Sequence, residues 1–120
     1  MTMNNTRTIG NIGERIALNF LLKNGYKILE RNFRVKFGEI DIIALIDHTI
    51  VFIEVKSRSN NKYGFPYESV NYKKQQKIIR VAQNYIKIKN IKECQYRFDI
   101  IEVYLNSSEK INHIVNAFWT

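Results

Sequence analysis

Two adjacent runs rich in β-branched residues, joined by only two residues, constrain this sequence more than any other feature. The runs extend over 39–46 and 49–58, and Asp47-His48 lies between them. β-Branched residues favour strands, and a two-residue connection is typical of an antiparallel hairpin. The sequence therefore predicts a β-hairpin centred on Asp47-His48, around which the other elements must pack.

The expected register brings two acidic side chains together at the end of the hairpin away from the turn. Asp41 is expected to face Glu54, and Glu39 to face Lys56. Directly opposed side chains have Cβ atoms roughly 4.5–5.5 Å apart, where two like charges destabilise the strand pair. A divalent cation such as Mg²⁺ or Mn²⁺ removes this repulsion, because it binds carboxylate oxygens at short range. The alternative is a solvated strand end, in which Glu39 pairs with Lys56 and a basic residue neutralises Asp41.

The two faces of the hairpin differ in polarity. Strand alternation places a wholly apolar set on one face, which is expected to be buried under a helix: Ile40, Ile42, Ala44, Ile46, Val51, Ile53 and Val55. On the other face Ile43 is expected opposite Phe52, and Leu45 opposite Ile50. This second face is therefore apolar near the turn and charged at its far end.

The remaining segments predict two helices and three further strands. Apolar residues at helical spacing predict a helix over about 8–24, ended by Asn24-Gly25, and a polar strand follows over 26–35. After an exposed loop over 59–68, a second helix is expected over about 70–89, capped by Ser69, with the apolar face Ile78, Ile79, Ala82, Tyr85 and Ile86. Strands over 95–105 and 111–119 close the chain. At 120 residues this is the size of one domain, so we expect one α/β domain over residues 1–120 in the order αβββαββ.

The charge balance indicates a polyanionic partner. Nineteen Lys and Arg residues oppose eleven Asp and Glu residues, which gives a formal net charge of +8. Nucleic acid is the commonest partner of such a chain, and an anionic membrane surface is the alternative. The polar first residues contain no apolar signal or spanning segment, so a cytoplasmic protein outside the membrane is expected. Cys94 is the single cysteine, which excludes an internal disulfide and a multi-cysteine zinc site.

Six short motifs occur in an order that resembles a known family. They are Gly10-x-x-Gly13-Glu14-x-x-Ala17, Gly25-Tyr26, Arg31-Asn32, Gly38-Glu39-Ile40-Asp41, Phe52-Ile53-Glu54-Val55-Lys56 and Arg97-Phe98-Asp99. Over nearly the whole chain they resemble the bacterial YraN family, which is regarded as endonuclease-like and is placed in the PD-(D/E)XK nuclease superfamily beside Holliday-junction resolvases and restriction enzymes. The resemblance implies a restriction-endonuclease-like core, with a central mixed sheet flanked by helices. One departure from the superfamily motif is Ile40, which stands before Asp41 where the motif has proline.

The resemblance also implies roles for individual residues. By it Asp41, Glu54 and Lys56 match the catalytic triad of the superfamily. Glu14 matches a helix-borne acid of some members, which would add a third carboxylate to the metal site. The residues alone also allow another interpretation, because the run 11–14 (Asn-Ile-Gly-Glu) fits a helix N-cap with a reciprocal Glu.

Basic residues outside the acidic cluster are expected to contact the nucleic-acid backbone. Lys74 and Gln75 match a Lys-Gln position of the family that would reach phosphate, and the alternative is a solvated helix start. Lys73 and Lys77 on the second helix, together with Arg58, would hold the backbone with little discrimination between base sequences.

Three further groups receive no catalytic role. Arg97 and Asp99 share one side of a strand, which favours a structural ion pair. The aromatic residues of the 59–68 loop are interpreted as pinning that loop, and stacking on unpaired bases is the alternative. His48 and His113 have no second His or Cys at metal-ligand spacing, so no function is assigned to them.

The leading hypothesis is metal-dependent hydrolysis of phosphodiester bonds. Asp41 and Glu54, with Glu14, would hold Mg²⁺ or Mn²⁺, and Lys56 would orient the attacking water or stabilise negative charge. DNA is favoured over RNA as the substrate, and junction-cutting relatives suggest branched DNA and a homodimer by analogy. One alternative is a nucleic-acid-binding module of the same fold that cleaves little alone. The other is a small interaction protein whose acids form an ion-pair network.

Overall fold

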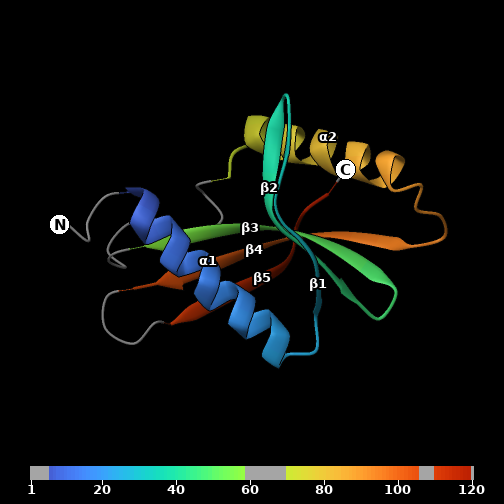
Figure 1. Cartoon of the computed structure of the whole chain (residues 1–120). Coiled ribbons are helices and arrows are strands. Elements are labelled where there is room, and N and C mark those ends of the chain that lie inside the picture. The colour runs from blue at the N-terminus through green and yellow to red at the C-terminus, as the bar shows by residue number, and fades with distance from the viewer. Residues whose placement is uncertain (1–5, 59–69, 106–109, 120) are drawn as a thin grey trace.

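The expected hairpin lies at the centre of the molecule (Figure 1). In the computed structural model, which describes residues 6–58, 70–105 and 110–119, strand β2 (Gly38–Ile46) pairs antiparallel with strand β3 (Thr49–Arg58). Asp47 and His48 have positive φ angles of 45° and 62°, as a two-residue hairpin turn requires. The hairpin and its turn are therefore as predicted.

Two helices and three more strands surround this hairpin in the order αβββαββ. They are α1 (Thr6–Lys23), β1 (Lys27–Val35), α2 (Tyr72–Ile88), β4 (Gln95–Tyr104) and β5 (Ile111–Phe118). The strands form one five-stranded mixed sheet in the order β1-β2-β3-β4-β5, in which β3 and β4 are parallel and the other neighbours antiparallel. The predicted α/β class is confirmed and is consistent with a restriction-endonuclease-like core. Neither described helix is long and apolar enough to cross a membrane.

One helix covers each face of the sheet. Leu21 of α1 is fully buried against the face that carries Ile42, Ala44, Val51 and Ile53. The apolar side of α2 packs against the opposite face, where the core residues include Ile43, Ile50, Phe52, Phe98 and Ile100. The predicted register also holds near the turn, since Ile43 pairs with Phe52 and Leu45 with Ile50. Alternation along the hairpin thus correctly predicts the buried face of Ile42 and Val51 and the apolar part of the other face near the turn.

Ile40 is the exception to this alternation. It is buried, but it packs with the α2 cluster and not on the face of Ile42. The pairing of β2 with β3 ends at Ile42–Ile53, whereas β2 continues to pair with β1 as far as Gly38. The free end of the β1–β2 ribbon therefore twists out of the sheet and crosses α2, where a Cβ on Gly38 would lie 3.0 Å from Cγ2 of Val81 (Figure 1). The predicted face of Ile40 is wrong because alternation assigns faces only while the strand stays in the plane of its sheet.

Both helix starts differ from the prediction. Because α1 begins at Thr6, Glu14 lies well inside the helix, and its interpretation as a capping residue is wrong. The N-cap of α2 is Asn71, whose Oδ1 accepts a 2.9 Å hydrogen bond from the backbone N–H of Lys74. The predicted cap, Ser69, and the aromatic residues of the 59–68 loop lie outside the described residues.

Candidate active site

The separation of β2 from β3 creates the candidate site. Asp41 is the first residue of β2 beyond the last β2–β3 pair, and its Oδ2 accepts a 2.8 Å hydrogen bond from the backbone N–H of Val55. The carboxylate thus accepts a hydrogen bond from a backbone N–H of β3 at a point where β2 no longer pairs with that strand. Glu39, which was expected to face Lys56, instead forms a 2.8 Å ion pair with Arg34 of β1. That prediction is wrong because the two strands no longer run side by side at Glu39.

Asp41 and Glu54 lie together even though they are not paired residues of the ladder. The Glu54 side chain is only 11% exposed. Burial, the charge of Asp41 and a hydrogen bond with the Asp41 carboxyl group raise the pKa of Glu54 to about 8, against the opposing charges of Lys74 and Lys56. Two carboxyl groups this close do not both ionise at neutral pH without a compensating cation.

Two lysines lie beside Glu54, and their pKa values are shifted in opposite directions. Lys74, from the first turn of α2, has its Nζ 3.6 Å from Oε1 of Glu54. Burial, followed by the hydrogen bond and charge of Lys74, lowers the pKa of Lys56. Burial acts on Lys74 in the same direction, but the hydrogen bond with Lys56 and the carboxylates of Glu54 and Asp41 outweigh it and raise the pKa of Lys74. Their mutual hydrogen bond therefore shifts the pKa values of the two lysines in opposite directions, down for Lys56 and up for Lys74.

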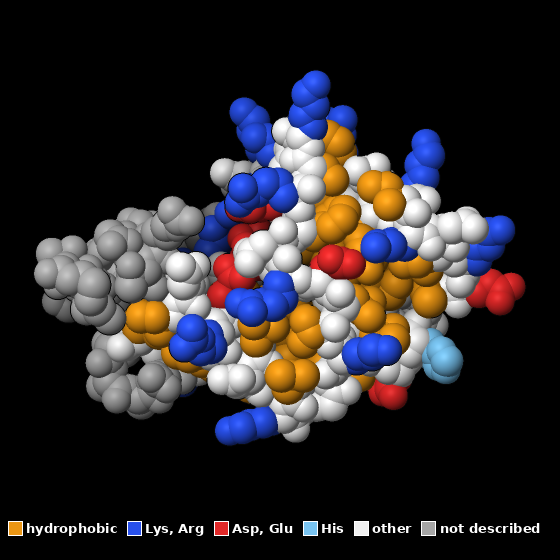
Figure 2. Space-filling model, viewed as in Figure 1, with side chains coloured by type: hydrophobic (Ala, Val, Ile, Leu, Met, Phe, Trp, Pro, Cys, Tyr) orange, Lys and Arg blue, Asp and Glu red, His pale blue; other side chains and the backbone are white. Residues whose placement is uncertain are grey.

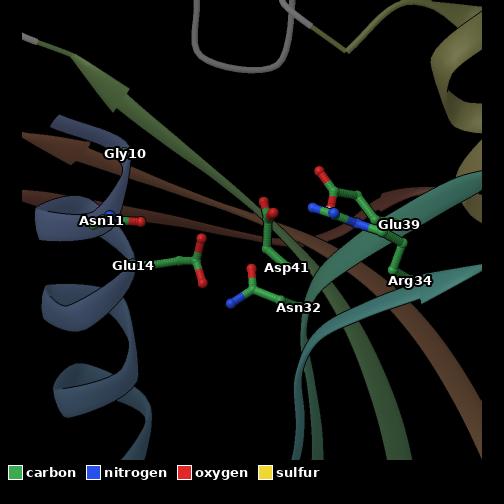
Figure 3. Close-up of a pocket in the computed structure, with 7 residues that line it drawn as sticks. All are labelled: Gly10, Asn11, Glu14, Asn32, Arg34, Glu39 and Asp41. Atoms are coloured by element: carbon green, nitrogen blue, oxygen red, sulfur yellow. The ribbon is translucent and has the colours of Figure 1, made fainter. Parts of the chain in front are cut away.

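Glu14 reaches the site because Gly13 allows a close helix–strand contact. A Cβ at Gly13 would lie 1.8 Å from Oγ of Ser57 on β3, so α1 approaches the sheet where a side chain would not fit. The Glu14 side chain then points toward Asp41 (Figure 3). Burial and the charge of Asp41 raise the pKa of Glu14, and a hydrogen bond with Asn32 opposes them.

A polar pocket of about 580 Å³ opens between α1 and the β1–β2 ribbon. Its lining residues are Gly10, Asn11, Glu14, Asn32, Arg34, Glu39 and Asp41 (Figure 3). Figure 2 shows acidic side chains gathered near the centre of this face, with Lys and Arg side chains above and below them. The site is thus an acidic cluster on a chain with a net charge of +8.

The other predicted contact residues have varied surroundings. Lys73 and Lys77 are exposed on α2. Gln75 donates a 2.9 Å hydrogen bond from Nε2 to the carbonyl of Val70, which fixes the start of the helix. The Nε of Arg58 lies 3.0 Å from Oε2 of the buried Glu102, to which the Tyr104 hydroxyl also donates. Contacts of these basic residues with nucleic acid stay predictions.

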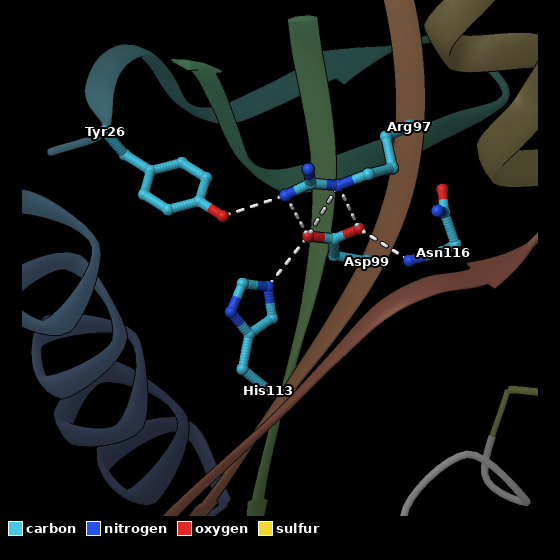
Figure 4. Close-up of polar contacts among 5 residues, drawn as sticks. All are labelled: Tyr26, Arg97, Asp99, His113 and Asn116. Atoms are coloured by element: carbon cyan, nitrogen blue, oxygen red, sulfur yellow. Dashed lines mark hydrogen bonds and ion pairs between the residues drawn. The ribbon is translucent and has the colours of Figure 1, made fainter. Parts of the chain in front are cut away.

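The predicted ion pair between Arg97 and Asp99 is confirmed, and it belongs to a larger network (Figure 4). Nε and an Nη of Arg97 donate to the fully buried Asp99 carboxylate at 2.9 Å. The Asn116 backbone N–H donates to it at 3.0 Å, and Nε2 of His113 lies 2.7 Å from it. The Nη2 of Arg97 that donates to Asp99 also donates to the hydroxyl of Tyr26 at 2.8 Å. Burial alone would raise the pKa of Asp99, but these hydrogen bonds hold it below its ordinary value. The network joins β4, β5 and the start of β1.

Sequence reasoning missed the place of Lys74 in the acidic cluster, and the pattern contains a signal for it. Lys74, Ile78 and Ala82 follow one another at intervals of four residues, so Lys74 continues the apolar side of α2. Glu102 carries the same kind of signal, because it alternates with the buried Ile100. A charged residue at a core position of the pattern indicates a buried partner.

Comparison with known proteins identifies the family. A family model described as "Uncharacterised protein family UPF0102" matches residues 13–103, a span that includes the acidic cluster and both lysines. The chain belongs to the UPF0102 family. UPF0102 proteins of Caldanaerobacter subterraneus and Clostridioides difficile are 56% and 55% identical to it, over 95% of this chain and 97% and 99% of theirs. The resemblance to the YraN family that the motifs indicated is thereby confirmed.

A solved structure offers a more distant comparison for this UPF0102 protein. It is the structure of SfsA from Pyrococcus furiosus in complex with Ca²⁺, and it shares 17% sequence identity with a TM-score of 0.36. The match covers 91% of the UPF0102 chain but 62% of the SfsA chain, so SfsA is considerably longer.

Proposed function

We propose that this UPF0102 protein is a metal-dependent nuclease that hydrolyses phosphodiester bonds of DNA. One observation carries the proposal: the carboxyl groups of Asp41 and Glu54 meet beside the amine of Lys56, at the point where β2 leaves β3. An acidic pair alone repels phosphate, so a cation is needed to bring the two together. The net charge of +8 supplies the general attraction to nucleic acid.

The acidic pair fits Mg²⁺ or Mn²⁺. Both cations take oxygen ligands and are often held by one or two carboxylates, with water and substrate phosphate completing the coordination. The raised pKa of Glu54 reflects burial and its repulsion by Asp41, which a divalent charge would relieve. Asp41 and Glu54 would hold the cation. The described residues contain no group of three acidic, His or Cys side chains that could share one ion, so Glu14 would act on the metal through its charge from the pocket wall and not as a third ligand. When bound, the cation would polarise the phosphate and favour formation of a nucleophile from water.

Lys56 would accept the proton of the attacking water. Burial and the neighbouring Lys74 lower the pKa of Lys56, which is the direction of shift that a general base requires. The ammonium group of Lys74 lies on the same side of Glu54 and would stabilise negative charge that develops on the phosphate. The two lysines therefore divide the work of base and electrostatic stabiliser.

Exposed lysines of α2 would hold the DNA backbone without reading its bases. Lys73 and Lys77 project into solvent, and phosphate contacts of this kind give affinity that falls steeply with salt. The same observation supports a second candidate function, a nucleic-acid-binding module that cleaves little alone. Selectivity for branched DNA and the pairing of two copies rest on the family analogy.

A cleavage assay tests the proposal. The purified chain is incubated with duplex, single-stranded and branched DNA and with RNA, in Mg²⁺, in Mn²⁺ and in chelator. Asp41→Ala and Lys56→Ala should abolish cleavage, whereas Lys87→Ala, an exposed lysine in the last turn of α2, should retain it. Cleavage that survives both site variants would come from a contaminant and would refute the proposal. Salt-sensitive binding without cleavage would support the binding module instead.

A further inference from the structure

Lys74 lies against the carboxyl group of Glu54, which a metal ion would use as a ligand. Its Nζ lies 3.6 Å from Oε1 of Glu54, whose side chain is nearly buried at 11% exposure. Lys73 and Lys77, its neighbours on α2, are exposed, whereas Lys74 turns inward toward β3. An ammonium group of the chain thus occupies the space beside one member of the acidic pair.

An ammonium group and a divalent cation compete for such a position. Like charges about 4 Å apart repel by several kcal/mol even at the moderate effective dielectric of a protein surface. The Lys74 side chain is 39% exposed and has a flexible four-carbon stem, so it can swing away while α2 stays in place. The backbone of Lys74 is fixed independently, because Asn71 caps the helix through the Lys74 N–H.

We propose that Lys74 is an internal cation that occupies Glu54 until a divalent metal binds, and that metal binding then releases its ammonium group to the phosphate of the nucleic acid. This inference rests on the proposed function, since it concerns the same acidic pair. It assigns Lys74 a role in coupling two ligands, beyond a general contact with phosphate.

The consequence is that metal and nucleic acid bind cooperatively. Metal alone must displace Lys74 from Glu54 and leave a solvated ammonium group beside a divalent charge. When a phosphate is present, it accepts that ammonium group, so the same displacement becomes more favourable. By linkage, metal must tighten nucleic-acid binding by the factor by which nucleic acid tightens metal binding. The protein would then hold its metal firmly only with substrate in place.

Mn²⁺ binding, measured by electron paramagnetic resonance of the free ion, tests this without any activity readout. In the absence of DNA, Lys74→Gln should bind Mn²⁺ about tenfold more tightly than wild type, because a neighbouring positive charge is removed. Removal of the Lys74 charge also strengthens the binding of a competing proton to Glu54. The gain is larger for the metal, because a divalent ion is repelled by a neighbouring positive charge twice as strongly as a proton is. Lys87→Gln makes the same change of net charge at the far end of α2 and should leave Mn²⁺ affinity within about twofold of wild type.

A second titration adds a short phosphorothioate DNA duplex, which resists hydrolysis. The duplex should tighten Mn²⁺ binding in wild type and much less in Lys74→Gln, because the variant has no ammonium group to transfer. Thermal unfolding followed by circular dichroism should show that Lys74→Gln is folded, since the backbone cap at Asn71 is unchanged.

The outcomes separate this inference from the proposed function. If Glu54→Gln loses Mn²⁺ binding but Lys74→Gln binds no more tightly than wild type, the acidic pair is a metal site and the role of Lys74 is refuted. Equal enhancement by DNA in wild type and Lys74→Gln would refute it as well. If wild type and Lys74→Gln both fail to bind Mn²⁺, or Glu54→Gln binds it normally, the metal site and the inference are both refuted.

Discussion

The close approach of Gly13 to Ser57 predicts that Gly13→Ala has opposite effects on stability in two backgrounds. It should destabilise the wild-type protein and should not destabilise a Ser57→Gly variant. Gly13→Ala adds a methyl group that would lie 1.8 Å from Oγ and 3.0 Å from Cβ of Ser57, but 3.7 Å from its Cα. Rotation of the Ser57 hydroxyl relieves the first overlap and leaves the second. In wild type the substitution must therefore push α1 away from β3. In a Ser57→Gly background only an ordinary van der Waals contact remains.

The magnitudes follow from two opposing effects. Alanine in a helix interior is more favourable than glycine by about 0.8–1 kcal/mol. Overpacking a well-packed contact typically costs about 1–3 kcal/mol. Gly13→Ala should therefore lower the free energy of unfolding by up to about 2 kcal/mol in wild type and raise it by up to about 1 kcal/mol with Ser57→Gly. The resulting coupling of roughly 2 kcal/mol is typical of residues in direct contact.

Urea denaturation of wild type, both single variants and the double variant measures this coupling. Gly10→Ala is the matched control, because it lies on the same helix and its added Cβ would have no neighbour within 4 Å. It should be neutral or stabilising in either background. In the cleavage assay Gly13→Ala should lose activity, since Glu14 moves with α1, and the double variant should recover it. Equal destabilisation by Gly13→Ala in both backgrounds would refute the close contact on which this reasoning rests.

Three further predictions concern the buried network, the pocket and the DNA surface. Asp99→Asn should lower the free energy of unfolding by about 3–5 kcal/mol at neutral pH, because an amide leaves Arg97 without its counter-charge. The pKa of Asp99 is lowered in the folded state, so the stabilisation that its carboxylate gives is present above the ordinary carboxyl pKa and is lost as the pH falls through the folded-state value. The urea midpoints of wild type and Asp99→Asn should therefore converge in acid. A gap between the midpoints that stays constant with pH would contradict this. Asn32 has a φ of 51°, so Asn32→Ala should lower the free energy of unfolding by about 1 kcal/mol in urea denaturation, whereas Asn32→Gly should not. Both variants should reduce cleavage, because Glu14 loses the amide with which it forms a hydrogen bond. Full activity in either variant would count against a role of this hydrogen bond in the site. Lys77→Ala should weaken DNA binding equally for all sequences. In fluorescence anisotropy titrations it should reduce the magnitude of the slope of log affinity against log salt concentration by about 0.9. An unchanged slope would show that Lys77 does not contact the DNA backbone.

The hairpin and the identity of the acidic cluster were predictable because they depend on local pattern. Strand alternation and a two-residue turn determine which residues pair near Asp47-His48, whatever else the chain does. Arg97 and Asp99 likewise form their ion pair because they lie two residues apart on one strand. The role of Glu14, by contrast, was expected only from the family resemblance, since the local pattern favoured a helix cap.

The partners that come from other elements could not be predicted from local pattern. His113 reaches Asp99 only because β5 lies beside β4, and Tyr26 reaches Arg97 only because α1 ends where it does. Lys74 approaches Glu54 across the packing of α2 on the sheet. Spacing indicated that Lys74 lies on the inner side of its helix, but the identity of its partner depends on where α2 crosses β3.

The three errors within the hairpin, at Ile40, at Glu39 and in the direct pairing of Asp41 with Glu54, have one cause, and that cause also makes the site possible. Had the ladder continued as predicted, Asp41 and Glu54 would form a directly opposed pair whose Cβ atoms lie roughly 4.5–5.5 Å apart, with strands on both sides and little room for a phosphate. Because β2 leaves the sheet after Ile42, the Asp41 carboxylate turns to the N–H of Val55, and the pocket opens beside it. The point where strand alternation fails is thus the point where a charged pair becomes accessible to a ligand. A hairpin whose regular pattern ends in opposed acids is better interpreted as two strands that separate there than as a strand pair that tolerates the repulsion.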